Sequence, residues 1–279
     1  MTTLVIGARG SIGRHVLDQL HTAGDPVRAG VRHLSTAGEL PAGVPVVRAD
    51  LTRPETLGPA LDGVRRVFVY ALPADPAPFA AAVAAAGVEH VVLLSSGSVL
   101  LPWTATNAIA REHREVEAAL PGCVPIRPLV LANNALAWAR SIRAEGVVRV
   151  AHPAAATAPI HERDIAAVAV AALRDPSTPG VSDLLTGPDA LTRHEQVRAI
   201  AAAAGRPIRI EELTPAAARA AFAAFTDAAT AAAILEFVRH ALEPGGSPVT
   251  GTFTRVTGRR PASFAQWARD HAAEFQGGV

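Results

Sequence analysis

The sequence predicts an α/β fold, with a doubly wound parallel sheet and a small, mostly helical C-terminal lobe. Short β-branched apolar runs alternate with helical patterns from the N-terminus to about residue 130. The runs are apolar throughout, as is typical of strands covered on both faces. A glycine-rich turn follows the first run directly. Parallel strands joined by helices imply right-handed crossovers.

The elements of this first part follow one another at short intervals. We expect strands at Thr3–Ile6, Val27–Val31, Val44–Arg48, Val67–Ala71, Val88–Ser95 and Val124–Pro128. We expect helices over Ile12–Ala23, Pro54–Leu61, Pro78–Ala86 and Thr106–Leu120. Each predicted helix connects two strands, which is the βαβ arrangement.

The glycine turn Gly7-Ala8-Arg9-Gly10-Ser11-Ile12-Gly13 lies between the first strand and the first helix. Gly7 permits a tight turn, Gly10 lets the backbone approach a pyrophosphate, and Gly13 lets helix and strand pack closely. The N–H groups at Ser11 and Ile12 then face the phosphates from the start of the helix. This context predicts a Rossmann-type dinucleotide site rather than an ordinary strand–helix turn.

The end of the second strand bears on the choice of dinucleotide. An NAD site usually places Asp or Glu there, to accept from the ribose 2′-hydroxyl. Arg32 stands at this point instead, and Arg9 lies in the glycine turn facing the same corner. Paired guanidinium donors suit a 2′-phosphate, so the sequence favours NADP(H). The alternative is that both arginines are solvated surface residues.

Three later segments complete the predicted cofactor site. Asp50 is placed to accept from the adenine amino group or, equally well, to cap the following turn, while Leu51 packs on the ring. Ala71-Leu72-Pro73 should run under the adenosine ribose and pyrophosphate. Pro128 should border the nicotinamide. For Asn133 and Asn134, which follow it, two roles stay open: contact with the substrate, or hydrogen bonding to backbone groups of the loop.

Beyond residue 130 the pattern loosens. We expect helices at Asp164–Leu173, with Asp164 as N-cap, at Arg193–Ala204 and at Pro261–Phe275, and a strand at Ser182–Leu185. Thr214–Leu242, with a break near Thr226, predicts two short helices that either form a lid over the substrate or complete the core. We expect residues 1–188 to form the NADP-binding domain, with some substrate-site segments from 130 on, and 189–279 a smaller substrate or lid region.

Composition excludes several classes of protein. The chain has 279 residues and a net charge of +1, with no basic stripe, so neither nucleic acid nor a membrane surface is an expected partner. The single cysteine, Cys123, excludes an intrachain disulfide and a Cys-rich metal site, and we expect no metal. With no predicted signal peptide or membrane span, we expect a cytoplasmic protein with a small-molecule substrate, either monomer or homodimer.

The order of these motifs resembles the NmrA-like atypical short-chain dehydrogenases over essentially the whole chain. The residues that carry the resemblance are Gly7 to Gly13, Ala49-Asp50-Leu51-Thr52, Leu61-Asp62-Gly63-Val64, His90 to Ser96, Ile126-Arg127-Pro128, Arg163-Asp164-Ile165-Ala166, Leu185-Thr186-Gly187-Pro188, Thr257 to Pro261 and Phe264-Ala265-Gln266-Trp267. Within that family the chain is most similar to actinobacterial polyketide ketoreductases. The resemblance implies reduction of a bulky aromatic, angucyclinone-like ketone in antibiotic biosynthesis.

The chain departs from the superfamily's usual Ser, Tyr and Lys. Ser95 and Ser96 fill the serine position at the end of the fifth strand. Where Tyr-x-x-x-Lys is expected, the aligned positions are Asn107 and Arg111, and the chain contains no lysine. An amide does not titrate and arginine stays charged, so neither performs the usual proton transfer.

Hydride transfer remains available, because the cofactor carries that chemistry. We hypothesise that Ser95 or Ser96 supports the carbonyl while the proton comes from the substrate, such as a phenol beside the ketone, or from water. His113 is a further candidate acid, since histidine titrates near neutral pH. His152, His161 and Tyr70 are others, although each is more often a packed or surface residue.

Two alternatives to a ketoreductase stay open. A quinone or enone reductase also needs little acid, and a non-catalytic NADP sensor would fit the missing Tyr/Lys pair directly. Phe222, Phe225 and Phe237 in the predicted lid suit a large planar ligand, or else belong to the core. A deep apolar pocket beside the nicotinamide would favour an enzyme, whereas a sensor should have that space filled.

Overall fold

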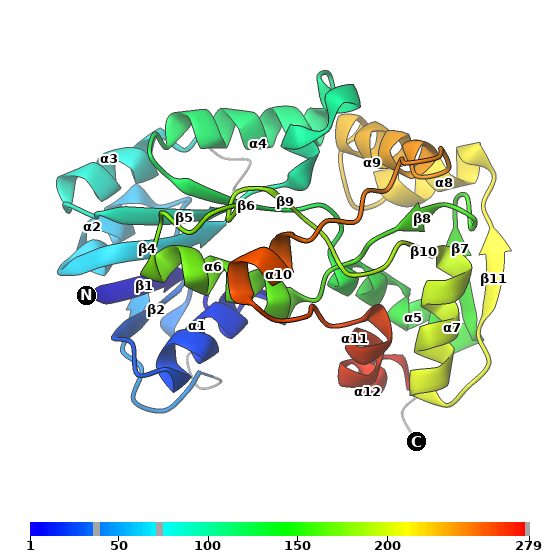
Figure 1. Cartoon of the computed structure of the whole chain (residues 1–279), viewed down its shortest axis with the longest axis horizontal. Helices are drawn as coiled ribbons and strands as arrows, with labels where there is room; N and C mark the ends of the chain where they lie inside the picture. The colour runs from blue at the N-terminus through cyan, green and yellow to red at the C-terminus, as the bar shows by residue number, and fades with distance from the viewer. Residues whose placement is uncertain (36–39, 71–74, 277–279) are drawn as a thin grey trace.

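The structure is a computed structural model that describes residues 1–35, 40–70 and 75–276. A seven-stranded parallel sheet forms one side of the molecule, and a smaller lobe lies at the carboxyl ends of its strands (Figure 1). The sheet strands are β1 (Thr2–Ile6), β2 (Val27–Val31), β3 (Val46–Arg48), β4 (Val64–Tyr70), β5 (His90–Leu94), β6 (Val124–Pro128) and β9 (Leu184–Leu185). Their order, β3-β2-β1-β4-β5-β6-β9, confirms the predicted Rossmann-type sheet.

Helices cover both faces of this sheet, as the apolar strands require. One face carries α1 (Gly13–Thr22) and α6 (Glu162–Arg174), against which Val5 packs. The other carries α2 (Leu57–Leu61), after the 3-10 turn η2 (Pro54–Thr56), then α3 (Ala77–Ala85) and α4 (Ala108–Ala119). Leu4 and Ile6 pack on this second face, so alternate side chains of one strand serve two cores.

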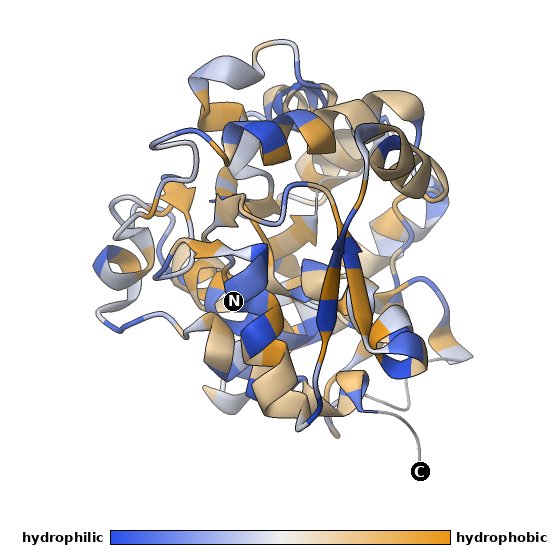
Figure 2. Cartoon of the chain, turned by 90° about the vertical axis from the view of Figure 1, so that its right-hand side faces the viewer, coloured by the Kyte–Doolittle hydropathy of each residue, from blue (hydrophilic) through white to orange (hydrophobic). Residues whose placement is uncertain are grey.

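The smaller lobe is built from segments on both sides of β9. Its strands are β7 (Val147–Val150), β8 (Ala156–Thr157), β10 (Leu191–Thr192) and β11 (Arg209–Glu212), and its helices are α5 (Ala139–Glu145), α7 (Arg193–Ala204), α8 (Pro215–Ala223), α9 (Ala228–His240), α11 (Phe264–Asp270) and α12 (Ala272–Phe275). β7 pairs in parallel with β11, and β8 antiparallel with β10. Figure 2 looks onto this lobe. Ile142, Ile200 and Trp267 lie in its core.

The connecting segments form short helices that the sequence did not signal. These are η3 (Gly97–Leu100), η4 (Pro102–Thr104), η5 (Ala132–Trp138) and α10 (Thr252–Thr257). η3 and η4 lead from β5 to α4, and η5 leads from β6 into the smaller lobe. α10 packs against α6. No helix in the described part of the chain is long and apolar enough to cross a membrane.

Two local predictions were wrong. α6 begins at Glu162, and its N-cap is His161, whose Nδ1 accepts from the Arg163 N–H. Asp164 lies in the first turn instead, where its Oδ2 accepts from the Ala262 N–H at 2.6 Å. The closing helix is two helices, α11 and α12, because the chain departs from helical geometry at His271.

A buried polar network joins α6 to α11. Glu162 is almost fully buried and accepts from Trp267 Nε1 at 3.0 Å, and its Oε1 lies 2.6 Å from His271 Nε2. His161 Nε2 lies 3.2 Å from Asp270 Oδ2. His161, Glu162 and His271 bring their ligand atoms within 4.8 Å of one another. Each of them already has a partner within the chain, so we interpret the cluster as a joint between the sheet and the smaller lobe.

Candidate cofactor and substrate site

The glycine turn has the geometry that a pyrophosphate seat requires. Gly7 has a φ of +76°, and a Cβ there would lie 2.9 Å from Cε1 of Tyr70 at the end of β4. A Cβ at Gly13 would overlap the Gly7 carbonyl, so helix and turn pack as the motif predicts. The N-cap residue of α1 is Ile12, whose apolar side chain makes no capping hydrogen bond. The N–H groups there, at the positive end of the helix dipole, suit phosphate oxygens.

The acidic and basic residues of the predicted adenosine corner lie close together. Asp50 is buried, and its Oδ1 accepts from both the N–H and the hydroxyl of Thr52, at 3.0 and 2.7 Å. These bonds, with the nearby Arg32 and Arg48 charges, hold the pKa of Asp50 below its ordinary value. Asp50 therefore caps its own turn through Oδ1. Arg9, Ser11 and Arg32 are exposed at this corner and stay predicted cofactor contacts.

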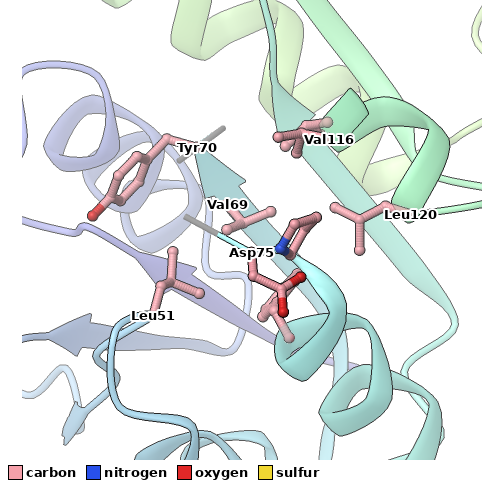
Figure 3. A pocket seen from close by; sticks show the side chains of 9 residues that line it. Leu51, Val69, Tyr70, Asp75, Val116 and Leu120 are labelled. Atoms are coloured by element: carbon pink, nitrogen blue, oxygen red, sulfur yellow. The ribbon is translucent and has the colours of Figure 1, made fainter. Parts of the chain in front are cut away.

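An apolar crevice lies beside this corner, between β4, α3 and α4. Tyr70 and Leu51 lie on one side of it, and Val116 and Leu120 of α4 on the other (Figure 3). Leu51, predicted to pack on the adenine, thus borders an apolar space next to the glycine turn. The predicted contacts Ala71, Leu72 and Pro73 lie outside the described residues.

Ser95 belongs to a buried charge network rather than to an open site. Its hydroxyl donates to Glu117 Oε1 at 2.5 Å, and Arg127 donates to both Glu117 oxygens, at 3.0 and 2.6 Å. Burial alone would raise the pKa of Glu117, but the bonds from Arg127 and Ser95 lower it. The network ties α4 to β5 and β6, and the hydroxyl proton of Ser95 is committed to it.

Ser96 lies one residue further, on the opposite side of the chain. It is partly exposed, caps η3 by accepting from the Ser98 N–H at 3.2 Å, and shares a hydroxyl–hydroxyl bond of 2.9 Å with Ser98. Of the two serines, Ser96 is therefore the one that can exchange its present hydrogen bond for a substrate oxygen.

Asn107 and Arg111, at the predicted Tyr and Lys positions, do not face a common space. Asn107 is buried at the N-cap of α4, and its Nδ2 donates to Ala233 O at 3.3 Å and to Glu236 Oε2 at 2.9 Å, both on α9. Arg111 is largely exposed and lies 3.8 Å from Glu115. The structure thus makes Asn107 a link to α9 and leaves Arg111 at the surface.

His113 lies on the inner side of α4, one turn before Glu117. Its Nδ1 is buried and has no hydrogen-bond partner in the described part of the chain. Burial lowers the pKa of the imidazole, although the Glu117 charge opposes this. The ring is therefore neutral near pH 7 and offers one N–H donor or one nitrogen acceptor.

A cavity of about 560 Å³ lies past the carboxyl end of β6, beyond Pro128. This is a size typical of ligand pockets. Its walls are mostly apolar and come from η5, β7, α7, α8 and α9. Phe222 and Phe225 line it, whereas Phe237 packs on Trp103 with ring centroids 5.8 Å apart. The predicted break falls at Asp227, which caps α9, and both α8 and α9 contribute residues to the wall of the cavity.

The polar residues of the cavity include two that the sequence suggested and two that it missed. Asn133 and Asn134 line it from η5. Arg149 and Arg193 also line it, from β7 and the first turn of α7. Neither arginine belongs to a recognisable motif, and each reaches the cavity only because segments far apart in the chain meet there.

Known proteins resemble this chain over its whole length. Residues 7–176 match a family described as NAD(P)H-binding. A (4-alkanoyl-5-oxo-2,5-dihydrofuran-3-yl)methyl phosphate reductase of Streptomyces griseus is 38% identical over 279 residues, 98% of each chain. An NAD(P)H azoreductase of Xenophilus azovorans is 34% identical over 284 residues, also 98% of each.

Solved structures agree on the fold. An NADPH-dependent quinone oxidoreductase of Escherichia coli, complexed with NADPH, superposes with a TM-score of 0.76 at 23% identity, covering 97% of this chain and 99% of the other. The glycine turn, the uncapped start of α1 and the sheet order are the parts of this chain that fit such a cofactor. The chain therefore belongs to the NAD(P)H-binding family and is an NAD(P)H-dependent oxidoreductase.

Proposed function

We propose that the chain is an NADPH-dependent reductase of a conjugated acceptor, an enone or a quinone. The observation that carries the proposal is a large apolar cavity at the predicted nicotinamide end, with no Tyr or Lys among its lining residues in the described chain. A conjugated acceptor needs little acid, because the negative charge formed on its oxygen is delocalised. A simple ketone places that charge on one alkoxide oxygen and depends far more on a donor.

When bound, NADPH supplies a hydride. Reduction of a C=C–C=O unit would leave negative charge on its carbonyl oxygen, and the proton for the resulting enolate would come from water or the substrate. Ser96 supplies a hydroxyl near the end of β5, and His113 a neutral imidazole with a partnerless Nδ1. Ser96 is partly exposed, so its hydroxyl is the candidate donor to the oxyanion, whereas His113 Nδ1 is buried. Residues of α8 and α9 complete the mostly apolar wall around the acceptor.

The names of the relatives support this choice over an ordinary ketoreductase. The Streptomyces griseus relative is named for a dihydrofuran that bears an oxo and an alkanoyl group, and the Xenophilus azovorans relative for azo reduction. The Escherichia coli structure is that of a quinone oxidoreductase. These three names share an electron-poor unsaturated acceptor.

A second candidate is reduction of an aromatic polyketide ketone, as in the simocyclinone 7-ketoreductase that the sequence resembles. The observation that favours it is the pair Phe222 and Phe225, whose rings stand 5.7 Å apart at 63° on the cavity wall. Such a wall suits a planar polycyclic ring. Here the proton would come from a phenol beside the ketone.

The test follows NADPH oxidation at its absorbance band with three matched acceptors: an enone, the corresponding saturated ketone and a quinone. Turnover of the enone and the quinone but not of the ketone, with the saturated product found by mass, is the expected result. Turnover of an angucyclinone ketone, lost when its neighbouring phenol is removed, would move the assignment to the second candidate. Tight NADPH binding without turnover of any acceptor would refute both and revive the sensor.

A pair of variants on α8 asks whether the cavity is the substrate site. Ala221 lines it, whereas Ala223, on the same helix and likewise exposed, does not. Ala221→Trp should lower kcat/KM at least about tenfold by filling the cavity, with NADPH affinity kept. Ala223→Trp should leave kcat/KM within about twofold. Equal effects of the two substitutions would place the substrate elsewhere.

A further inference from the structure

The cavity bordered by α8 and α9 contains a cation that no carboxylate of the described residues neutralises. Arg193, the first residue of α7, lines the cavity and is partly buried. Its Nη1 donates to Thr157 Oγ1 at 3.3 Å and to Gln196 Oε1 at 2.9 Å, and its guanidinium lies 5.9 Å from the centre of the Trp138 ring. All three of these partners are uncharged.

No carboxylate of the described residues forms an ion pair with Arg193, and its Nε and Nη2 have no hydrogen-bond partner there. Desolvation lowers the pKa of the guanidinium to about 10, so it still carries its charge at neutral pH. A cation in the first turn of a helix is also disfavoured by the helix dipole. Desolvation and the helix dipole therefore both disfavour a positive charge at Arg193, and no ion pair among the described residues offsets them.

The other arginine of the cavity, Arg149, has its charge neutralised by carboxylates of the chain. Arg149 donates to Glu211 Oε2 at 2.9 Å and to Glu145 Oε1 at 3.2 Å. Two carboxylates thus compensate its charge before any ligand binds. Arg149 and Arg193 line one cavity, but only Arg193 is left without an anion among the residues that the structure describes.

The residues around Arg193 hold it in a fixed orientation. Gln196 is almost completely buried, and its Nε2 donates to Thr157 Oγ1 and to Leu191 O, both at 3.0 Å. With its amide so fixed, Gln196 presents Oε1 to the guanidinium. A preorganised guanidinium loses little entropy on binding, and its remaining paired N–H groups match the two oxygens of a carboxylate or phosphate.

We propose that Arg193 binds an oxyanion group on the substrate, a phosphate ester or a carboxylate, and so selects anionic conjugated acceptors over neutral ones. This proposal rests on the proposed function for the reacting group, a conjugated acceptor. The binding of an anion at Arg193 is argued independently of it. The rest of the acceptor then lies along the apolar wall of the cavity, with Phe222 and Phe225 covering it.

Binding is measured first, by calorimetry on protein saturated with NADP⁺ so that the dinucleotide site is filled. The probes are phenyl phosphate, benzoate and benzyl alcohol. Phenyl phosphate or benzoate should bind and the alcohol should not, and the tighter of the two identifies the oxyanion. Arg193→Gln should raise the Kd of that anion at least about tenfold, and Arg193→Lys should retain part of the affinity. Arg198→Gln is the matched control, because Arg198 is on the same helix but is exposed and does not line the cavity; it should change the Kd less than about threefold.

Turnover supplies the second measurement, with a naphthoquinone acid and its methyl ester. The wild type should prefer the acid in kcat/KM, and Arg193→Gln should lower the acid-to-ester ratio at least about tenfold. A merely structural role would lower both substrates together and leave the ratio unchanged. That result, or equal anion affinity in wild type and Arg193→Gln, would overturn the proposal. Absence of turnover with both quinones would refute the proposed function, while calorimetry still decides the anion site.

Discussion

At the scale of single residues, the hydrogen-bond partners of a side chain separate structural from functional roles. Ser95 and Asn107 were both predicted as catalytic from their places in the sequence, yet each is held by a specific partner, Glu117 and Glu236. Ser96 is partly exposed and bonds only to Ser98, so its hydroxyl can still engage a substrate, whereas the partnerless Nδ1 of His113 is buried. Position along the chain pointed to the end of β5 and to α4, but partners from other elements decide which side chain there is available.

The sequence predicts the cofactor site more directly than the substrate site, for a physical reason. The glycine turn performs its role within seven consecutive residues, so its geometry is encoded locally. Arg193 acquires its role from Trp138 and Thr157, which lie more than thirty residues away along the chain. Neither a periodicity nor a short motif in the sequence predicts such a contact between distant segments.

The cofactor preference is also decided by single residues. Arg32 follows β2, where an NAD site would place an acid. Arg32→Ala should weaken NADPH about tenfold to a hundredfold, the loss of one charge-assisted hydrogen bond, and leave NADH nearly unchanged. KM for the two cofactors, measured side by side, checks this. Arg174→Ala is the matched control, since Arg174 is an exposed arginine at the far end of α6, paired with Asp25. Equal losses for NADPH and NADH would show that Arg32 does not contact a 2′-phosphate.

At the scale of elements, periodicity predicted the sheet far better than the smaller lobe. β2 and β6 have the predicted bounds, and α7 begins and ends where expected. β8 and β10, by contrast, have two residues each, too few for an alternation to appear. They exist because the lobe packs around them. Predicting such elements requires knowing which distant segments meet.

The contact between α4 and α9 is a prediction at this scale. Asn107→Asp keeps the N-cap oxygen but replaces the donor to Glu236 with a second negative charge. We expect a loss of about 1–2 kcal/mol, a Tm lower by a few degrees, and a substrate KM raised about tenfold as the lid loosens. Thermal unfolding and steady-state kinetics measure these effects.

The double variant provides the control for this contact. Asn107→Asp combined with Glu236→Gln reverses the direction of the hydrogen bond, because the new amide can donate to the new carboxylate. It should recover part of the lost stability and substrate affinity, because the bond from Asn107 to Ala233 O is not restored. If the double variant is as impaired as Asn107→Asp alone, α9 does not depend on this bond.

At the scale of the whole molecule, two lobes are held together by buried polar groups rather than by apolar contacts alone. His161 and Glu162 of α6 meet Asp270 and His271 at the C-terminal end. Burying such groups is costly unless each is paired, and here each is. The joint fixes the smaller lobe against the sheet and so fixes the cavity against the cofactor. Its ionisation state should therefore matter for the stability of the entire fold.

Buried histidines make the stability of the fold sensitive to acid. Burial lowers the pKa of His15, His113 and His161 below 6.5, their ordinary value. Between the folded and unfolded pKa values the unfolded chain binds more protons, so the free energy of unfolding falls as pH drops below about 6.5. Each histidine contributes a slope of at most about 1.4 kcal/mol per pH unit. Urea unfolding at pH 7.5, 6.5 and 5.5 measures the total slope.

Single variants then assign that slope to residues. His15 Nε2 and His113 Nδ1 are both buried without a hydrogen-bond partner in the described part of the chain, so glutamine at either position removes a titrating group without breaking a recorded bond. His113→Gln and His15→Gln should each make stability less dependent on pH in this window, and their effects should add because α4 and α1 lie on opposite faces of the sheet. A wild-type stability that stays constant from pH 7.5 to 5.5 would show that these imidazoles are not desolvated in the folded protein.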